Sequence, residues 1–171
     1  MKYRKGFIKF AIAVSVCAVI IFGLSSLNSV KCAEYAYDVT ACVSGTLITP
    51  LVQSPEITIL SFDIKGIMRS NDAGKIFDNC TVHSQGINMI EGKDQTVLSY
   101  MKYLAPDGDY VIFRFTQNPG ETSATTTIMM GTGKWKGITG GGKATRLTQG
   151  KPVTPDSFQF CNRHTGKFTL P

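Results

Sequence analysis

Short segments in which apolar and polar residues alternate make up most of the chain after about residue 34. They are rich in Thr, Val, Ile, Phe and Tyr, and turn residues separate them at intervals of about 10–14 residues. No stretch sustains the period of an amphipathic helix. The pattern predicts an all-β chain with strands at 35–44, 46–52, 57–69, 78–90, 95–104, 109–117, 122–130, 141–148 and 157–169.

The segments between these strands are short and have the composition of turns. Asn71-Asp72-Ala73-Gly74, Pro106-Asp107-Gly108 and Asn118-Pro119-Gly120 are the clearest examples. Short connections join antiparallel neighbours, and about eight such strands must close or stack to hide their edges. Residues 34–171 are therefore expected to form a single domain, a closed antiparallel up-and-down barrel of about eight strands. A sandwich is the second choice.

Alternation also sorts side chains onto two faces, although it does not say which face points inward. Val111, Phe113 and Phe115 share one face of their strand, and Arg114 lies on the other. Both faces carry apolar or aromatic residues, which is more than a one-sided sheet needs. We therefore expect a barrel whose interior is filled or holds a ligand, together with a contact surface on its exterior.

The first residues have the pattern of a secretory signal. Lys2, Arg4, Lys5 and Lys9 precede an apolar run of 15 residues, 10–24, and small and polar residues follow it. Such a run is too short for a comfortable membrane span. We interpret residues 1–33 as a helical signal peptide and expect export, to a bacterial periplasm or the extracellular space. The alternative is an uncleaved anchor, and only then would a membrane be a partner.

The net charge of the chain falls once residues 1–33 are set aside. The whole chain has 18 Lys plus Arg against 12 Asp plus Glu, a net charge of +6. Five of the basic residues and none of the acids precede residue 34, so the remaining domain has 13 bases against 12 acids, a net charge of +1. That domain also lacks a basic patch interleaved with aromatic residues. No nucleic-acid partner is therefore expected, whereas a homo-oligomer stays open.

The cysteines indicate one candidate disulfide. Cys42 lies near the start of the domain and Cys161 near its end, and they would meet if the terminal strands were neighbours, as in a closed barrel. The alternative is that these cysteines are small apolar residues of the core.

Residues 131–142 hold six of the 17 glycines and the only tryptophan, Trp135. A phosphate loop does not fit, because residues 137–144 end in Ala144, which has no hydroxyl group for a metal ion, and no strand-then-helix context surrounds them. The glycine spacing does not fit a dinucleotide site either. We expect a tight structural connection in which Trp135 plugs the barrel end or packs under the loop. Its key glycines are Gly131, Gly133, Gly137 and Gly140.

This segment resembles the G-T-G-K-aromatic-x-G-x-x-G signature of the allene oxide cyclase and dirigent proteins. The resemblance extends over most of 57–171 and includes Asn71 to Gly74, Val82 to Gly86, Asp107-Gly108-Asp109 and Cys161-Asn162-Arg163. It is strongest to small exported bacterial proteins with an allene-oxide-cyclase-like barrel. The resemblance implies an eight-stranded antiparallel barrel. Because its motifs are glycines and turns, it implies no activity residue by residue.

Candidate ligand-binding residues are polar or aromatic side chains that could face the barrel lumen. An inward Arg or Glu beside aromatic rings would orient a carboxylate or polarise an enolate, and the alternative is a solvated outer face. Asn162, Arg163 and His164 form a polar cluster where a barrel mouth could lie. The candidates are Glu91, Tyr100, Tyr103, Tyr110, Arg114, Trp135, Asn162, Arg163 and His164.

No catalytic constellation, metal site or cofactor site can be assigned. His83 and His164 lack the spacing of zinc ligands, and Asp107 and Asp109 flank a glycine as turn residues do. The sequence therefore predicts an exported barrel that binds a small hydrophobic ligand or a partner. The alternative is an isomerase or cyclase of the allene oxide cyclase type that acts on a hydrophobic substrate in the lumen. A lumen packed solid with side chains would exclude both.

Overall fold

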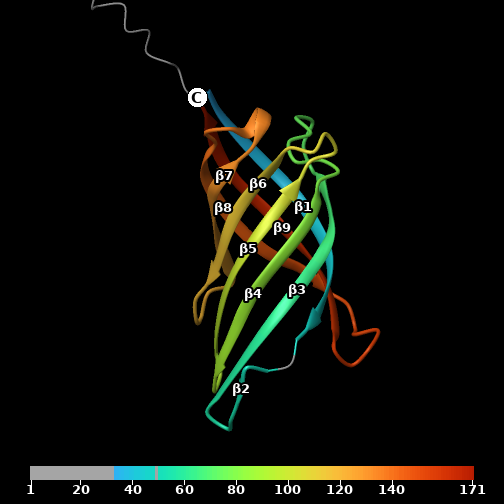
Figure 1. Cartoon of the computed structure of the whole chain (residues 1–171), viewed down its shortest axis with the longest axis vertical. Helices are drawn as coiled ribbons and strands as arrows, with labels where there is room; N and C mark the ends of the chain where they lie inside the picture. Colours follow the sequence, from blue (N-terminus) through green and yellow to red (C-terminus); the bar gives the residue numbers. More distant parts are fainter. Residues whose placement is uncertain (1–32, 49) are drawn as a thin grey trace, which may run out of the picture. The chain divides into compact units, whose positions relative to one another are not determined.

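The structure, a computed structural model, describes residues 33–48 and 50–171 (Figure 1). The predicted signal helix lies outside them. Within the described ranges no helix has the length and hydropathy to cross a membrane. The elements are β1 (Ala33–Leu47), β2 (Val52–Gln53), β3 (Ile57–Ser70), β4 (Thr81–Glu91), β5 (Asp94–Leu104), β6 (Tyr110–Gln117), β7 (Ser123–Gly131), the 3₁₀ turn η1 (Gly133–Trp135), β8 (Thr139–Gln149) and β9 (Ser157–Leu170).

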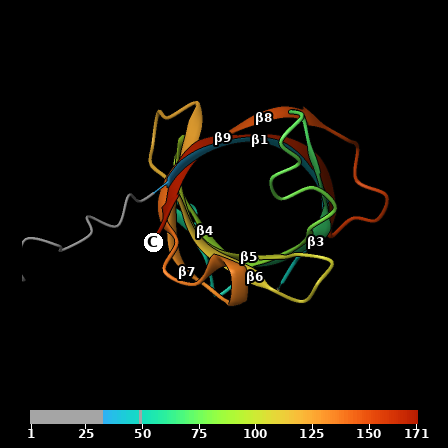
Figure 2. The ribbon, with the colours of Figure 1, turned by 90° about the horizontal axis from the view of Figure 1, so that it is seen from above.

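Eight of these strands close into an antiparallel barrel. From β3 to β9 each strand pairs with the next along the chain, and β1 pairs with both β9 and β3. Val39 of β1, for example, lies opposite His164 of β9 on one side and Ser70 of β3 on the other. Figure 2 shows the resulting ring viewed from above. The predicted all-β fold and closed eight-stranded up-and-down barrel are confirmed.

The predicted strand break near residue 45 is wrong. β1 continues through Gly45, which lies opposite Phe158. A Cβ atom at residue 45 would lie 2.4 Å from the Phe158 ring. The glycine therefore does not mark a turn; it allows the Phe158 side chain to pack against the strand. β4 begins later than predicted, at Thr81, because Phe77 and Asn79 have φ angles of 56°, which do not fit a strand.

One end of the barrel is filled by the loop between β3 and β4. Figure 2 shows this green loop projecting into the ring from the side of β3. Its Phe77 side chain is only 3% exposed. The ring centroid of Phe77 lies 5.1–5.9 Å from those of five other aromatic rings, mostly in edge-on or tilted geometry. Those rings belong to Tyr37, Tyr103, Phe113, Trp135 and Phe168.

The glycine-rich connection covers the same end. Gly133 has a φ angle of 48°, and a Cβ atom there would lie 1.9 Å from the Asp109 carboxylate. That carboxylate accepts a hydrogen bond of 3.0 Å from the backbone N–H of Lys134, which fixes the start of η1 and sets Trp135 against Phe77. Gly131 ends β7 and Gly137 follows η1. Gly140 already lies in β8, which starts earlier than the predicted 141.

A disulfide joins the first and last strands. Cys42 of β1 and Cys161 of β9 lie directly opposite each other, 119 residues apart in sequence. Both side chains are on the outer face. In the chain-entropy treatment, closing a loop of this length stabilises the fold by about 4–5 kcal/mol. Cys80 is buried and unpaired in the described part of the chain, and burial raises the pKa of its thiol to about 11, so it is a poor nucleophile.

We expect Phe77→Ala to lower the free energy of unfolding by about 3–5 kcal/mol, because it removes a fully buried ring and leaves a cavity. Denaturant titration followed by circular dichroism measures this change. Ile67→Ala is the matched control, since Ile67 is 60% exposed on the outer face. A loss below about 1 kcal/mol for Phe77→Ala would show that the loop does not fill the barrel end.

Candidate functional site

The half of the barrel away from Phe77 contains a cavity of about 470 Å³. Its deep residues, such as Ser84 and His164, are each 3% exposed, whereas Leu47 at its rim is 39% exposed. A volume of this size suits a small-molecule ligand. Seven of the eight barrel strands contribute at least one inward-facing side chain to its wall, and β7 contributes its first residue, Ser123.

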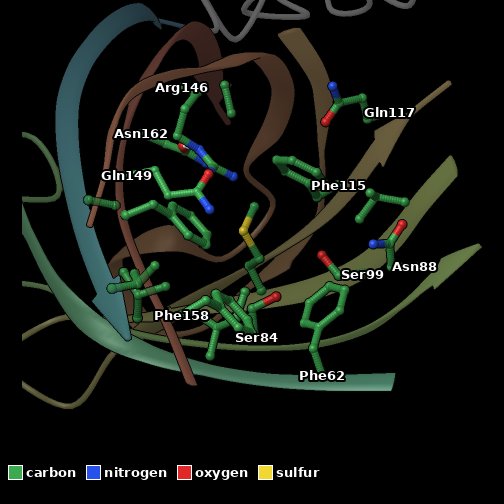
Figure 3. Close-up of a pocket in the computed structure, with 18 of the residues that line it drawn as sticks. Phe62, Ser84, Asn88, Ser99, Phe115, Gln117, Arg146, Gln149, Phe158 and Asn162 are labelled. Atoms are coloured by element: carbon green, nitrogen blue, oxygen red, sulfur yellow. Dashed lines mark hydrogen bonds between the residues drawn. The ribbon is translucent and has the colours of Figure 1, made fainter. Parts of the chain in front are cut away.

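Most of the wall is apolar. Inward positions recur at every second residue of each strand, so Val97, Met101 and Phe115 face the cavity and their neighbours face solvent. Figure 3 shows three labelled phenylalanine rings around the space. The apolar lining residues are Ala41, Val43, Leu47, Leu60, Phe62, Ile64, Val82, Val97, Met101, Phe115, Ala144, Phe158 and Phe160.

One wall carries a positively charged anchor, Arg146 of β8. Its Nε donates a hydrogen bond of 2.7 Å to Asn162 Oδ1, and its Nη1 donates one of 3.0 Å to Gln149 Oε1. Its guanidinium carbon lies 3.8 Å from the centroid of the Phe160 ring. Three contacts therefore fix the group, and Figure 3 shows it pointing into the cavity. Fixing a donor in advance lowers the entropic cost of binding an anion.

A β-bulge makes this arrangement possible. Residues three apart in a regular strand face opposite sides of the sheet. The register of β8 on β9 shifts between Arg146 and Thr148, so Arg146 lies opposite Asn162 and Gln149 lies opposite Phe160. Both Asn162 and Phe160 face the interior. The extra residue thus brings Arg146 and Gln149 to the same face, within hydrogen-bond distance of each other.

The opposite wall carries uncharged polar groups. Figure 3 shows Ser84, Asn88 and Ser99, from β4 and β5, across the cavity from Arg146. Ser84 Oγ and Asn88 Oδ1 are buried and have no hydrogen-bond partner among the described residues. An unpaired buried polar atom costs roughly 1–3 kcal/mol. A bound molecule with complementary groups would remove that cost.

His164 and Tyr103 form a buried pair at the deep end of the cavity. Tyr103 Oη and His164 Nδ1 are 2.9 Å apart, and the two side chains are 1% and 3% exposed. Burial lowers the pKa of the imidazole to about 4 and raises the pKa of the phenol well above 10. Both groups are therefore neutral at ordinary pH.

Of the cavity-lining residues that the structure describes, Arg146 alone carries a formal charge. Among the described residues, no Asp, Glu or Lys lines the cavity, and no cluster of His, Cys, Asp and Glu could hold a metal ion. The interior is an apolar space with one cation on its wall and hydrogen-bonding groups around it. Such a site favours a molecule with an apolar body and an anionic or strongly polar oxygen group.

The structure brings three of the predicted lumen residues into the barrel. Tyr103, Asn162 and His164 all point inward. Trp135 instead packs against Phe77 at the filled end, with ring centroids 5.1 Å apart, which fits the predicted role as a plug. Whether any of these residues binds a ligand stays a prediction.

The lumen placement of the other five candidates is wrong. Tyr100, Tyr110 and Arg114 lie on the outward positions of β5 and β6, where Tyr100 is 53% exposed. Tyr110 lies under the Lys102 ammonium, 4.3 Å from its ring centroid. Arg163 faces outward and pairs with Asp38, whose pKa it lowers to about 2 through hydrogen bonding. Glu91 is exposed at the end of β4.

Sequence reasoning missed the residues that give the cavity its polarity: Arg146, Gln149, Ser84, Asn88 and Ser99. The alternation of β9 could have identified the inward face of the barrel. Its inward positions all lie on one face of the strand: Phe158, Phe160, Asn162, His164 and Phe168. No comparable signal marked Arg146, because glycines precede it and the bulge follows it.

The fold and cavity define a closed eight-stranded barrel with an open, ligand-sized half. No protein-family model matches the chain, and no curated protein sequence matches it. The solved structure of the pterocarpan synthase dirigent protein PsPTS1 is similar, with a TM-score of 0.53, 14% identity, and 82% of this chain and 96% of that chain covered. For the pterocarpan synthase dirigent protein GePTS1 the TM-score is 0.49, with 11% identity and coverage of 81% and 86%.

At such low identity the likeness to PsPTS1 shows the fold alone: the domain is a dirigent-like barrel. The eight-stranded antiparallel barrel that the sequence resemblance implies is thereby confirmed. The expected relation to allene oxide cyclases and to small exported bacterial proteins stays a prediction.

Because burial lowers the pKa of His164, we expect the free energy of unfolding to depend on pH. Its pKa is about 4 in the folded protein and 6.5 in the ordinary case, so the unfolded chain binds more protons between these values. The free energy of unfolding should therefore fall as the pH is lowered from 6.5 to 4, by up to about 3 kcal/mol. Denaturant titrations across this range measure the slope.

Two variants separate His164 from other groups. His164→Asn, which keeps a polar group near the Tyr103 hydroxyl, should lose the slope, and His83→Asn on the outer wall should keep it. Asp38 and Asp63 have pKa values of about 2 in the folded protein and 3.8 ordinarily, so they lose most of their stabilisation below pH 4 and contribute little to the slope above it. An unchanged slope in His164→Asn would contradict a neutral, buried His164.

Proposed function

We propose that this protein binds a small hydrophobic molecule in the open half of its barrel, and that the molecule carries one anionic or strongly polar oxygen group. The single observation that carries the proposal is Arg146, a lone cation fixed by Asn162 and Gln149 on the wall of an apolar cavity. The rings of Phe62, Phe115 and Phe158 supply the surface for the apolar body.

The energetics favour such an amphiphile over a purely apolar molecule. Each 100 Å² of apolar surface removed from water contributes roughly 2.5 kcal/mol. A hydrogen bond to a charged group adds roughly 1.5–3 kcal/mol, which corresponds to about 10- to 100-fold in affinity. The anionic group is expected at Arg146 and not at the opposite wall, because Ser84 and Asn88 are uncharged and Arg146 is the one cation among the described lining residues.

Export belongs to the same proposal and rests on the pattern of residues 1–33. The Cys42–Cys161 disulfide supports it, because disulfides persist in oxidising compartments such as the periplasm and the extracellular space. A barrel in such a compartment would carry or sequester a sparingly soluble molecule. Assembly with a second copy or another partner stays a lesser proposal, supported by exposed Ile87, Leu98 and Tyr100 on the outer wall.

An isomerase or cyclase is the second candidate function. It is favoured by one observation: Arg146 and the neutral imidazole of His164 face the same cavity from adjacent strands. A cation that polarises a carbonyl beside a group that can move a proton is the minimum for enolate chemistry. A binding protein and an isomerase can be told apart by the molecule that is released, because only the enzyme releases it chemically changed.

Two matched fluorescent probes test ligand binding. 8-Anilinonaphthalene-1-sulfonate carries one anionic group, and N-phenyl-1-naphthylamine is the same ring system without it. We expect both to bind the folded full chain at one site, with the sulfonate bound more tightly. Arg146→Met should weaken the sulfonate probe by roughly 10-fold or more and change the uncharged probe by less than about 3-fold.

Arg114→Met is the matched control, because Arg114 is an exposed arginine on the outer wall. It should leave both affinities within about 2-fold of the original. Near-ultraviolet circular dichroism shows whether each variant is folded. Equal losses in Arg146→Met and Arg114→Met, or no binding of either probe, would contradict the proposal.

A further inference from the structure

The hydrogen bond between Tyr103 and His164 determines which imidazole nitrogen carries the proton. Tyr103 is 1% exposed, and His164 Nδ1, 2.9 Å from its oxygen, is the only described hydrogen-bond partner of its hydroxyl group. A buried hydroxyl hydrogen without an acceptor is costly. The Tyr103 hydroxyl therefore donates to Nδ1. A neutral imidazole that accepts at Nδ1 carries its own hydrogen on Nε2.

His164 Nε2–H is left free for a bound molecule. Among the described residues no hydrogen bond involves this atom, while His164 lines the cavity. Because burial keeps the imidazole neutral at pH 7, Nε2 is an N–H donor without a formal charge. A neutral donor in an apolar space pairs best with a neutral acceptor, such as a carbonyl or ether oxygen.

The spacing from Arg146 limits where that oxygen lies on the ligand. Arg146 lies opposite Asn162, and His164 is two residues further along β9 on the same face. Two residues of an antiparallel strand span roughly 7 Å. The Arg146 guanidinium lies over the Phe160 ring, on the other side of Asn162 from His164. An anion at Arg146 and a neutral oxygen at Nε2 would therefore lie at different depths of the cavity, with an apolar part of the molecule between them.

We propose that His164, positioned by Tyr103, is a second polar subsite that selects molecules with an uncharged carbonyl or ether oxygen separated by an apolar part from their anionic group. This inference rests on the proposed function, since it assigns the deep end of the same cavity. Arg146 binds the charged end near the mouth, and His164 Nε2–H binds the neutral oxygen at the floor. Tyr103 acts as a positioning residue that holds the imidazole in the required tautomer.

Two carboxylates of similar shape test the subsite. 4-Benzoylbenzoate has a ketone between its two rings, and 4-benzylbenzoate has a methylene group in the same place. Calorimetry on the full chain should show the ketone bound roughly 5- to 10-fold more tightly, the amount expected for one net hydrogen bond. In His164→Phe the two affinities should become equal. In Tyr103→Phe the preference should fall only partly, because the free imidazole then samples both tautomers.

Equal affinities in the unmodified protein, or a preference for the ketone that persists in His164→Phe, would overturn this subsite and leave the proposed function standing. If neither carboxylate binds, the proposed function fails with it. His83→Asn, on the outer wall, is the control and should keep the preference.

The tautomer of His164 can also be measured without changing His164 or Tyr103, so this test does not depend on the folding of those variants. Long-range ¹H–¹⁵N spectra of histidine-labelled protein, with His83→Asn to assign the signals, report the tautomer directly. We expect His164 protonated at Nε2 at pH 7, and we expect 4-benzoylbenzoate to shift that N–H resonance more than 4-benzylbenzoate does. Protonation at Nδ1 instead would overturn the inference.

Discussion

The packing of Phe77 into one end of the barrel is the interaction on which the rest of the structure depends. The interior of an eight-stranded barrel is just wide enough to be filled by its own side chains. Here a side chain from the β3–β4 loop completes the filling of one half, where its ring lies 5.7 Å from that of Tyr103. Tyr103 in turn bonds to His164. The filled half therefore supports the floor of the cavity, and the other half stays open.

Strand β9 connects these two halves. Its inward side chains run from Phe158 at the open half through Asn162 and His164 to Phe168 in the filled half. Its outward face is tied to β1 by Cys161. The bulge in β8 occurs where Thr148 lies opposite this cysteine, so the covalent link lies next to the irregularity that turns Gln149 inward. One rigid strand thus fixes the polar anchor, the floor and part of the core.

Much of this architecture could be predicted from the sequence, because period-two alternation and short turns are local signals. The terminal pairing that places Cys42 opposite Cys161 follows from closure. The cavity could not be predicted, since it depends on a loop with Phe77 in a left-handed conformation and on a bulge beside Arg146. Tyr100 and Arg114 were misplaced because both faces of their strands carry apolar residues. Arg163 was misplaced because, in a strand, its side chain points to the opposite face from those of Asn162 and His164.

A crystal structure of the full chain with 8-anilinonaphthalene-1-sulfonate tests most directly the central claim, that the open half of the barrel is the binding site. The expected result is one probe molecule inside the barrel, with its sulfonate hydrogen-bonded to Arg146 and its rings against Phe62, Phe115 and Phe158. A probe found only on the outer wall, over Ile87 and Leu98 of β4 and β5, would contradict it.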